Sequence, residues 1–383
     1  MKTKYTTENI WTVLLWAVML ATNIFFIGKY FPRAGLNPVI SAIVYGAVIT
    51  GLAFLYKKRI AALISKRVAC GLSVILTVGI LLFIALAIRF IEPYSLQVDR
   101  WSATTFFLDG LVQGIYPYGI HTHAAETNFP SPFPLWHYLN IPFWLIGDVG
   151  WIQAFFILVF LGAVYYCFRS WHTVLGTLLL LYISPSYWWE LAVRSDSLSN
   201  AFLVCACILF IQRFPLKMDR QWWLLAILSG CLASTRLSAI IPMALYLFYP
   251  WLQANWKVQI GFIGIAIGII AFFFSPYIFW DTENWVFFQR NPFMSQTSPG
   301  SPWILGIMVL IAIAIAYKKK TFYYYLSTTS LFMFAFMLFT QLGVIYRSPE
   351  PVTLFDVCCD ISYFTLAIPY AILGLTMPKE TKL

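Results

Sequence analysis

Charged side chains are scarce in this sequence. Only 10% of the 383 residues are Asp, Glu, Lys or Arg, whereas 61% are hydrophobic. A soluble domain carries about 25% charged residues. The stretches between the apolar runs are also too short to form a soluble domain of any size. These two absences exclude a soluble globular protein and predict a polytopic membrane protein with an all-α fold and a single transmembrane domain over residues 1–383.

Motifs for metal, disulfide and nucleotide binding are missing as well. The seven cysteines form no CxxC and no zinc-type spacing, and most lie inside apolar runs, where they are typical of small core residues. His121, His123 and His137 complete no known ligand set, which favours satisfied or solvated histidines over zinc. The lack of a Gly-rich phosphate cradle disfavours a cytoplasmic nucleotide-sugar donor. The first apolar run, 10–27, has no small-residue cleavage site and therefore indicates a helix and not a cleaved signal.

The apolar runs predict about twelve transmembrane helices. Several are short for a hydrocarbon core of about 30 Å. The stretch 221–253 is compatible with two short helices meeting at Ser234–Arg236 or with one irregular element. The predicted spans are 9–28, 36–56, 68–91, 150–168, 171–188, 196–212, 221–235, 237–253, 257–280, 302–317, 321–345 and 355–376.

The distribution of charge predicts the orientation of these spans. Lys and Arg concentrate in short loops such as 57–67 and 318–320, which the positive-inside rule places in the cytoplasm together with both termini. Most acidic residues then face outward. The net charge of +10 therefore indicates membrane topology and not nucleic-acid binding. We expect a multi-pass protein of the bacterial inner membrane, surrounded by lipid and active on its outer face.

The longest outward connection is 92–149, which contains two segments of helical pattern, 99–114 and 135–145, and a Pro- and aromatic-rich connector, NFPSPFPLW. Asp99 opens the first segment close to the membrane–water boundary. A carboxylate there could accept a proton from a hydroxyl acceptor whose co-substrate is a lipid. The alternative is an acid placed at a helix N-terminus because the helix dipole favours it.

Several arginines fall on the outward side. Guanidinium groups bind phosphate and carboxylate bidentately, so these residues predict oxyanion recognition, with ordinary Arg–acid pairing as the alternative. Arg236 is the strongest phosphate-binding candidate, followed by Arg347 and Arg194. Glu190, Arg194 and Asp196 form an outward cluster that could line a substrate site. The outward arginines are Arg89, Arg100, Arg194, Arg236, Arg290 and Arg347.

The outer loop resembles the first outer loop of the GT-C superfamily, integral-membrane glycosyltransferases that use polyprenyl-phosphate-linked sugars. The matching residues are Asp99, Phe106 or Phe107, Gly110, Gly114, Tyr116, Pro117, Tyr118, Pro130, Pro132 and Pro134. The segment ASTRLSAIIP is also similar to the family's turn with a basic residue before a helix, whereas the last hundred or so residues match only in hydropathy. The nearest resemblance is to bacterial mannosyltransferase-like members. It implies that Asp99 is the catalytic base.

The resemblance implies transfer of a hexose, with mannose suggested, from a polyprenyl phosphate to an extracytoplasmic glycan, lipid or protein acceptor. An inverting displacement needs no carboxylate nucleophile. Substrate-binding candidates are Arg236, Arg347, Arg194, Arg100, Tyr116, Tyr118, Asp196 and Asp281. No cofactor is required with certainty, but Asp281 and Glu283 could hold Mg²⁺ or Mn²⁺, or simply form a solvated loop.

Two further interpretations stay open. An O-antigen polymerase or ligase also uses outer arginines, although its large outer loop usually falls late in the chain. A lipid flippase or solute transporter would place charges within its spans, whereas here most acids gather on one side. Asp356 and Asp360 are expected on one helix face near the outer end of the last span, where they could pair with Arg347.

Overall fold

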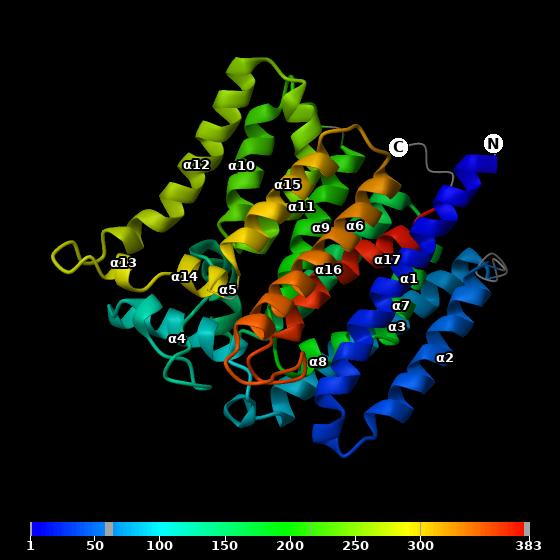
Figure 1. Ribbon diagram of the computed structural model, residues 1–383, viewed down its shortest axis with the longest axis horizontal. Helices are drawn as coiled ribbons and strands as arrows, with labels where there is room; N and C mark the ends of the chain where they lie inside the picture. Colours follow the sequence, from blue (N-terminus) through cyan, green and yellow to red (C-terminus); the bar gives the residue numbers. More distant parts are fainter. Residues whose placement is uncertain (1, 58–63, 215, 299, 379–383) are drawn as a thin grey trace.

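The computed structural model describes residues 2–57, 64–214, 216–298 and 300–378, and within these ranges every regular element is a helix (Figure 1). The predicted all-α fold is confirmed. Residues 58–63 of the basic run at 57–67, and the extreme ends of the chain, lie outside the described residues. The α-helices are α1 (Lys2–Tyr30), α2 (Pro38–Lys57), α3 (Lys66–Phe90), α4 (Arg100–Gln113), α5 (Pro134–Leu145), α6 (Trp151–Phe168), α7 (Trp171–Tyr182), α8 (Pro185–Ala192), α9 (Ser197–Arg213), α10 (Trp222–Ala233), α11 (Leu237–Leu252), α12 (Trp256–Ile278), α13 (Val286–Gln289), α14 (Pro292–Thr297), α15 (Pro302–Ala316), α16 (Phe322–Arg347) and α17 (Ile368–Thr376). Short 3₁₀ helices are η1 (Pro32–Ala34), η3 (Pro93–Ser95), η4 (Pro117–Gly119) and η5 (Ile361–Ala367).

Local sequence signals account for many helix starts. The side chains of Ser65, Ser170, Asn255 and Thr321 each accept a hydrogen bond from a backbone N–H in the first turn of the helix that follows. Such caps satisfy N–H groups that have no partner inside the helix. Proline begins several other helices, where its missing N–H costs nothing. The ends of the apolar runs are therefore encoded locally.

Within the described residues, six helices are long and apolar enough to cross a membrane, and up to eight if two bent helix pairs each count as one span. The chain is therefore a multi-pass membrane protein. One bent pair joins α8 to α9 at an angle of 112°. Each predicted span contains a helix, but α7, α10, α11 and the η5–α17 segment are shorter than the roughly 20 residues that a straight crossing needs. The count of twelve crossings stays a prediction.

The region 221–253 forms two short helices, α10 and α11, that meet at Ser234–Arg236, which confirms one of the two interpretations. The predicted span 171–188 is interrupted, since α7 ends at Tyr182 and α8 begins at Pro185. The expected helix at 355–376 begins late. Asp356 and Asp360 lie in the loop ahead of η5, so the prediction that they share a helix face is wrong.

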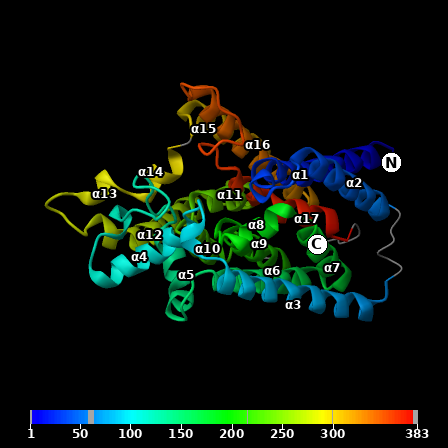
Figure 2. The ribbon, with the colours of Figure 1, turned by 90° about the horizontal axis from the view of Figure 1, so that it is seen from below.

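The outer-loop segments gather at one end of the bundle. α4, α5, α13 and α14 lie together there in two perpendicular views, whereas α1 begins at the opposite end (Figures 1 and 2). We call α4, α5, α13 and α14, with the loops that join them to the bundle, the cap. A separate apolar cluster holds the cap together, with Phe107, Tyr118, Phe133, Tyr277 and Phe287 buried in it. The large core of the bundle is built mainly from α1, α6, α9, α16 and α17. The two helices predicted within 92–149 are thus confirmed and packed against α12.

Candidate functional site

Asp99 lies directly before α4, at the junction between the bundle and the cap. Its backbone carbonyl accepts the first helical hydrogen bond from Ala103, but its side chain does not cap the helix. The partly exposed carboxylate instead accepts a hydrogen bond from the Thr122 hydroxyl at 3.3 Å. Among the described residues no cation lies within ion-pairing distance of Asp99. Its carboxylate therefore retains acceptor capacity.

Arg100, the next residue, is buried and ties three elements together. Its guanidinium donates to Ser197 at the start of α9 (2.6 Å), to Ser362 in η5 (2.8 Å) and to the Asp360 carboxylate (2.5 Å). The guanidinium carbon also lies 4.7 Å from the centre of the Tyr363 ring. Arg100 thus fixes the position of Asp99 relative to the bundle.

A second buried arginine completes the charged cluster. Arg236 adopts an extended backbone immediately before α11, and its Nη2 lies 2.5 Å from both carboxylate oxygens of Asp196. Asp196 is also 3.9 Å from Arg100. We call Arg100, Asp196, Arg236 and Asp360 the charged cluster. Arg100, Asp196 and Arg236 are buried, and buried charges are tolerated when they are paired in this way, whereas the Asp360 side chain is 44% exposed.

The sequence prediction brought three members of this cluster together, namely Arg100, Asp196 and Arg236, and missed the place of Asp360. Asp360 was expected on a helix, where it could pair with Arg347 or one of Asp356 and Asp360 could stay protonated, whereas the structure pairs Asp360 with Arg100. Lys29 at the end of α1 holds the loop that carries Asp360, because its ammonium group donates to the carbonyls of Asp356 and Cys359.

Electrostatics keeps the Asp360 carboxylate ionised. Burial by itself raises the pKa of Asp360, but the Arg100 guanidinium and two hydrogen bonds from Ser362 outweigh burial and hold the pKa below its usual range. His137, behind the cluster in α5, is fully buried against Phe107, with ring centres 3.6 Å apart. Burial lowers the pKa of His137 to about 3, so this ring is neutral and donates from Nε2 to the Pro132 carbonyl.

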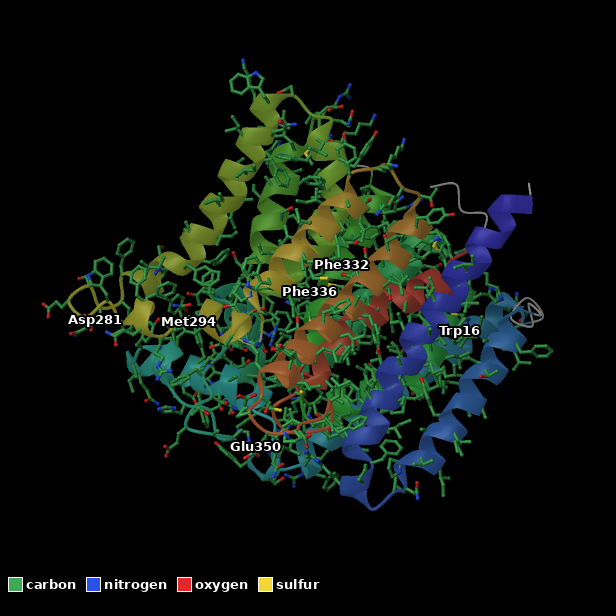
Figure 3. The ribbon with its side chains drawn as sticks, in the orientation of Figure 1. Trp16, Asp281, Met294, Phe332, Phe336 and Glu350 are labelled. Carbon is green, nitrogen blue, oxygen red and sulfur yellow. The ribbon has the colours of Figure 1, made fainter. Side chains whose placement is uncertain are left out.

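An apolar groove begins beside the charged cluster. It is a cavity of about 570 Å³ between α11, α15 and α16. Phe332 and Phe336 line it from α16, on the part of this helix that lies beside α15 (Figure 3). Its walls are mostly aliphatic and aromatic. Its polar lining includes Asp360, Tyr363, Gln341, Gln296 and Thr340, and we call the end that these residues form the mouth. No sequence signal marked this groove, because the apolar residues of α11, α15 and α16 do not reveal which face of each helix lines a cavity.

Three other predicted substrate ligands are engaged in structural contacts. Arg194 donates to the carbonyls of Ala87, Ile88 and Ile91 at the end of α3 and pairs with Asp148 at 2.9 Å. The Tyr118 hydroxyl donates to the Pro132 carbonyl, and the Tyr116 hydroxyl to the Arg290 carbonyl. These contacts hold the cap to the bundle and to the loop after α12.

Arg347 and Asp281 lie outside the charged cluster. Arg347 is exposed at the end of α16 and donates to the Gly343 carbonyl. Asp281 lies at the tip of the exposed loop after α12, far from the groove residues Phe332 and Phe336 (Figure 3), and accepts hydrogen bonds from Glu283 and Asn284. The described residues contain no group of three or more His, Cys, Asp or Glu side chains placed to hold a metal ion. The Mg²⁺ or Mn²⁺ prediction thus concerns a loop separate from the cluster.

A comparison with protein-family models, curated proteins and solved structures finds no match to this chain.

Proposed function

We propose that this protein is a GT-C-type membrane glycosyltransferase that moves a hexose, with mannose the first candidate, from a polyprenyl phosphate to an acceptor outside the cytoplasm. The observation that carries the proposal is the apolar groove whose mouth adjoins the charged cluster. A lipid-linked sugar phosphate matches this arrangement, because its long apolar chain would occupy the groove and its anionic phosphate would lie at the charged cluster.

The dimensions of the groove suit an isoprenoid chain. Its lining on α11 extends from Leu237 to Phe248, which corresponds to about 16 Å at 1.5 Å per residue. Its volume falls within the range of roughly 300–1,000 Å³ for small-molecule pockets. Exposed apolar side chains of α15, such as Val309 and Ile313, flank the opening. A chain could therefore enter sideways from the bilayer.

The charged cluster offers guanidinium groups to the phosphate. Arg100 donates to Asp360 at the mouth, and Arg236 directly precedes Leu237, which lines the groove. A phosphate could replace the Asp360 carboxylate at Arg100 without leaving a buried cation unpaired. The guanidinium would then stabilise the charge that develops on the leaving phosphate.

Asp99 is the proposed base. The acceptor hydroxyl oxygen attacks the anomeric carbon and transfers its proton to the Asp99 carboxylate, while the bond from the anomeric carbon to the phosphate oxygen breaks. The products are a glycoside of inverted configuration and a lipid phosphate monoester. Asp99 suits this role because its carboxylate is partly exposed and adjoins Arg100, the proposed phosphate ligand.

The proposal includes the membrane topology. About twelve crossings would place 92–149 and the charged cluster outside, with both termini in the cytoplasm of a bacterial cell. Bent or short helices such as the α8–α9 pair would then cross together with their neighbours. The separation of the cap from the start of α1 supports this arrangement (Figure 2).

A transfer assay tests the proposal. Purified protein is offered radiolabelled polyprenyl-phosphate mannose or glucose together with candidate glycan, lipid and protein acceptors. Asp99→Asn should abolish transfer without changing the unfolding midpoint. Asp109→Asn is the matched control, because Asp109 lies on α4 and only accepts a hydrogen bond from the Trp144 indole. Full activity of Asp99→Asn would reject the base assignment.

One observation favours a second candidate, a transporter. The α8–α9 pair is broken, and Asp196 lies at its break. Broken helices with charged residues line substrate sites in secondary transporters. Uptake or flipping of labelled lipid by proteoliposomes, in the absence of any glycosyl transfer, would favour this candidate.

A further inference from the structure

The mouth of the apolar groove contains one buried oxygen that has no donor. Gln341 of α16 lines the groove and is only 3% exposed. Its Nε2 donates to the Asp360 carbonyl at 3.1 Å. Its Oε1 is buried without a hydrogen-bond partner among the described residues. An unpaired buried acceptor is costly because it has lost its hydrogen bond to water, so a group that supplies a hydrogen-bond donor there would be held strongly.

The orientation of the Gln341 amide follows from its neighbours. A carbonyl oxygen can only accept, so the atom that contacts the Asp360 carbonyl must be the nitrogen. The oxygen is therefore the atom left for a ligand. A ligand that satisfies it must present an O–H or N–H group.

Two other polar side chains at the mouth are already engaged in hydrogen bonds. Gln296 donates to the Ser131 carbonyl and accepts from the Leu237 backbone N–H. The Thr340 hydroxyl donates to the Phe336 carbonyl, one turn earlier in α16. Among the described side chains that line the groove, the buried acceptor without a partner is that of Gln341.

The charges at the mouth indicate which kind of hydrogen-bond donor fits there. The Arg100 guanidinium lies 2.5 Å from the Asp360 carboxylate, and Asp360 is the residue whose carbonyl Gln341 contacts. An ammonium group that displaced Asp360 would face a buried cation, whereas a phosphate would replace one anion with another. A neutral hydroxyl next to a phosphate therefore matches both Gln341 and Arg100.

Resting on the proposed function, we propose that Gln341 is a specificity residue that accepts a hydrogen bond from a hydroxyl of the donor sugar, close to the phosphate. The spent lipid phosphate has no such hydroxyl and leaves the Gln341 oxygen unpaired. Gln341 would thus make the loaded donor bind more tightly than the spent lipid, which promotes exchange of one for the other after transfer.

Binding of two short-chain lipids tests this inference. The full chain in nanodiscs is titrated with citronellyl phosphate mannose and with citronellyl phosphate. The wild type should prefer the sugar-bearing lipid. Gln341→Met keeps the volume but removes the acceptor, so it should weaken binding of the sugar-bearing lipid about tenfold and leave binding of citronellyl phosphate unchanged.

Two further variants separate recognition from structure. Gln341→Glu keeps an acceptor oxygen but loses the N–H group that donates to the Asp360 carbonyl. Its added negative charge should weaken the binding of both lipids, while the retained oxygen should preserve the preference for the sugar-bearing lipid. Met337→Leu changes a neighbouring groove residue without a polar atom and should also preserve that preference. If Gln341→Met weakens the binding of both lipids equally, or weakens the binding of neither, the inference is overturned.

The transfer assay distinguishes this result from failure of the proposed function. A preference that depends on Gln341, without transfer to any acceptor, would leave the inference standing and reject the glycosyltransferase. Transfer activity together with a lipid preference that Gln341→Met does not alter would reject the inference and leave the glycosyltransferase proposal standing. Failure of the wild type to bind either lipid would reject both.

Discussion

Arg236 and Asp196 show how single residues hold the candidate site in shape. Both side chains are nearly inaccessible, at 2% and 6% exposure, and they meet where α9 and α11 begin. Removing both charges from water is costly, and the pair is tolerated only because each partner neutralises the other. The contact that positions the Arg236 guanidinium, a proposed phosphate ligand, therefore also holds two helix starts together.

Removal of Arg236 alone should be severe. Arg236→Leu leaves the Asp196 carboxylate buried beside Arg100 only, at 3.9 Å, and we expect a loss of about 3–5 kcal/mol in the free energy of unfolding. The double variant Arg236→Leu/Asp196→Leu should recover most of that loss. Denaturant unfolding in micelles measures both. A double variant as unstable as the single one would contradict this account.

The Asp360 ion pair predicts a dependence of stability on pH. Because Arg100 and Ser362 hold the pKa of Asp360 below its ordinary value in the folded protein, the pair contributes stability above the unfolded pKa of about 4. That contribution is lost as the pH falls further, through the folded pKa. The unfolding midpoint of the wild type should therefore drop on acidification.

Asp360→Asn provides the control for that titration. It should lower the midpoint at neutral pH and flatten the decline between about pH 5 and the lowest pH at which the protein stays soluble. A decline as steep as in the wild type would assign the acid sensitivity to other carboxylates.

At the scale of elements, the close contact between α10 and α12 depends on one glycine. A Cβ added at Gly230 would lie 2.8 Å from the Ala266 carbonyl oxygen and 2.8 Å from the Ile269 Cβ. Small residues allow membrane helices to approach closely where burial of apolar surface supplies no driving force. α12 also carries Phe274 and Tyr277, which anchor the cap, so this contact supports the site indirectly.

Gly230→Val should separate these two helices and destabilise the protein by about 1–3 kcal/mol, since backbone on α12 cannot move aside cheaply. Gly264→Ala on α12 is the matched control, because a Cβ there meets nothing within 4 Å. Thermal unfolding in the same detergent compares them. Equal midpoints for the two variants would refute the packing argument.

At the scale of the whole molecule, the chain forms a helix bundle and a cap, each with its own apolar cluster. The cap brings 92–149 together with the loop after α12 through its own apolar cluster. The charged cluster lies where cap and bundle meet, since Arg100 belongs to the cap helix α4 and contacts Ser197 and Asp360 of the bundle. Relative movement of the two parts would therefore alter the site directly.

The proposed orientation can be checked by labelling. In a chain whose native cysteines are replaced, Ala125→Cys and Lys319→Cys place single thiols at exposed positions. A membrane-impermeant maleimide should modify residue 125 in intact cells and residue 319 only after permeabilisation. Labelling of 319 from outside would invert the topology and move the charged cluster to the cytoplasm.

Hydropathy predicted most of the helices, because the length of an apolar run depends only on neighbours in the chain. The loop that carries Asp356 and Asp360 was mistaken for helix, since apolar residues around it continue the pattern of the last span. Similarly, nothing in a single sequence distinguishes Arg194, which binds helix-end carbonyls, from Arg100, which binds a carboxylate at the groove.

The sequence by itself determined the all-helical membrane character and the two cap helices, because composition and short-range pattern govern burial in a bilayer. It also predicted that Asp99, Arg100 and Arg236 lie on the outward side, which stays a prediction. Only the tertiary structure decided that Asp360 pairs with Arg100 and that Gln341 retains an unpaired oxygen at the mouth of an apolar groove. Those features depend on contacts between helices far apart in the chain, and a helix that is apolar on every side does not reveal which of its faces will line a cavity.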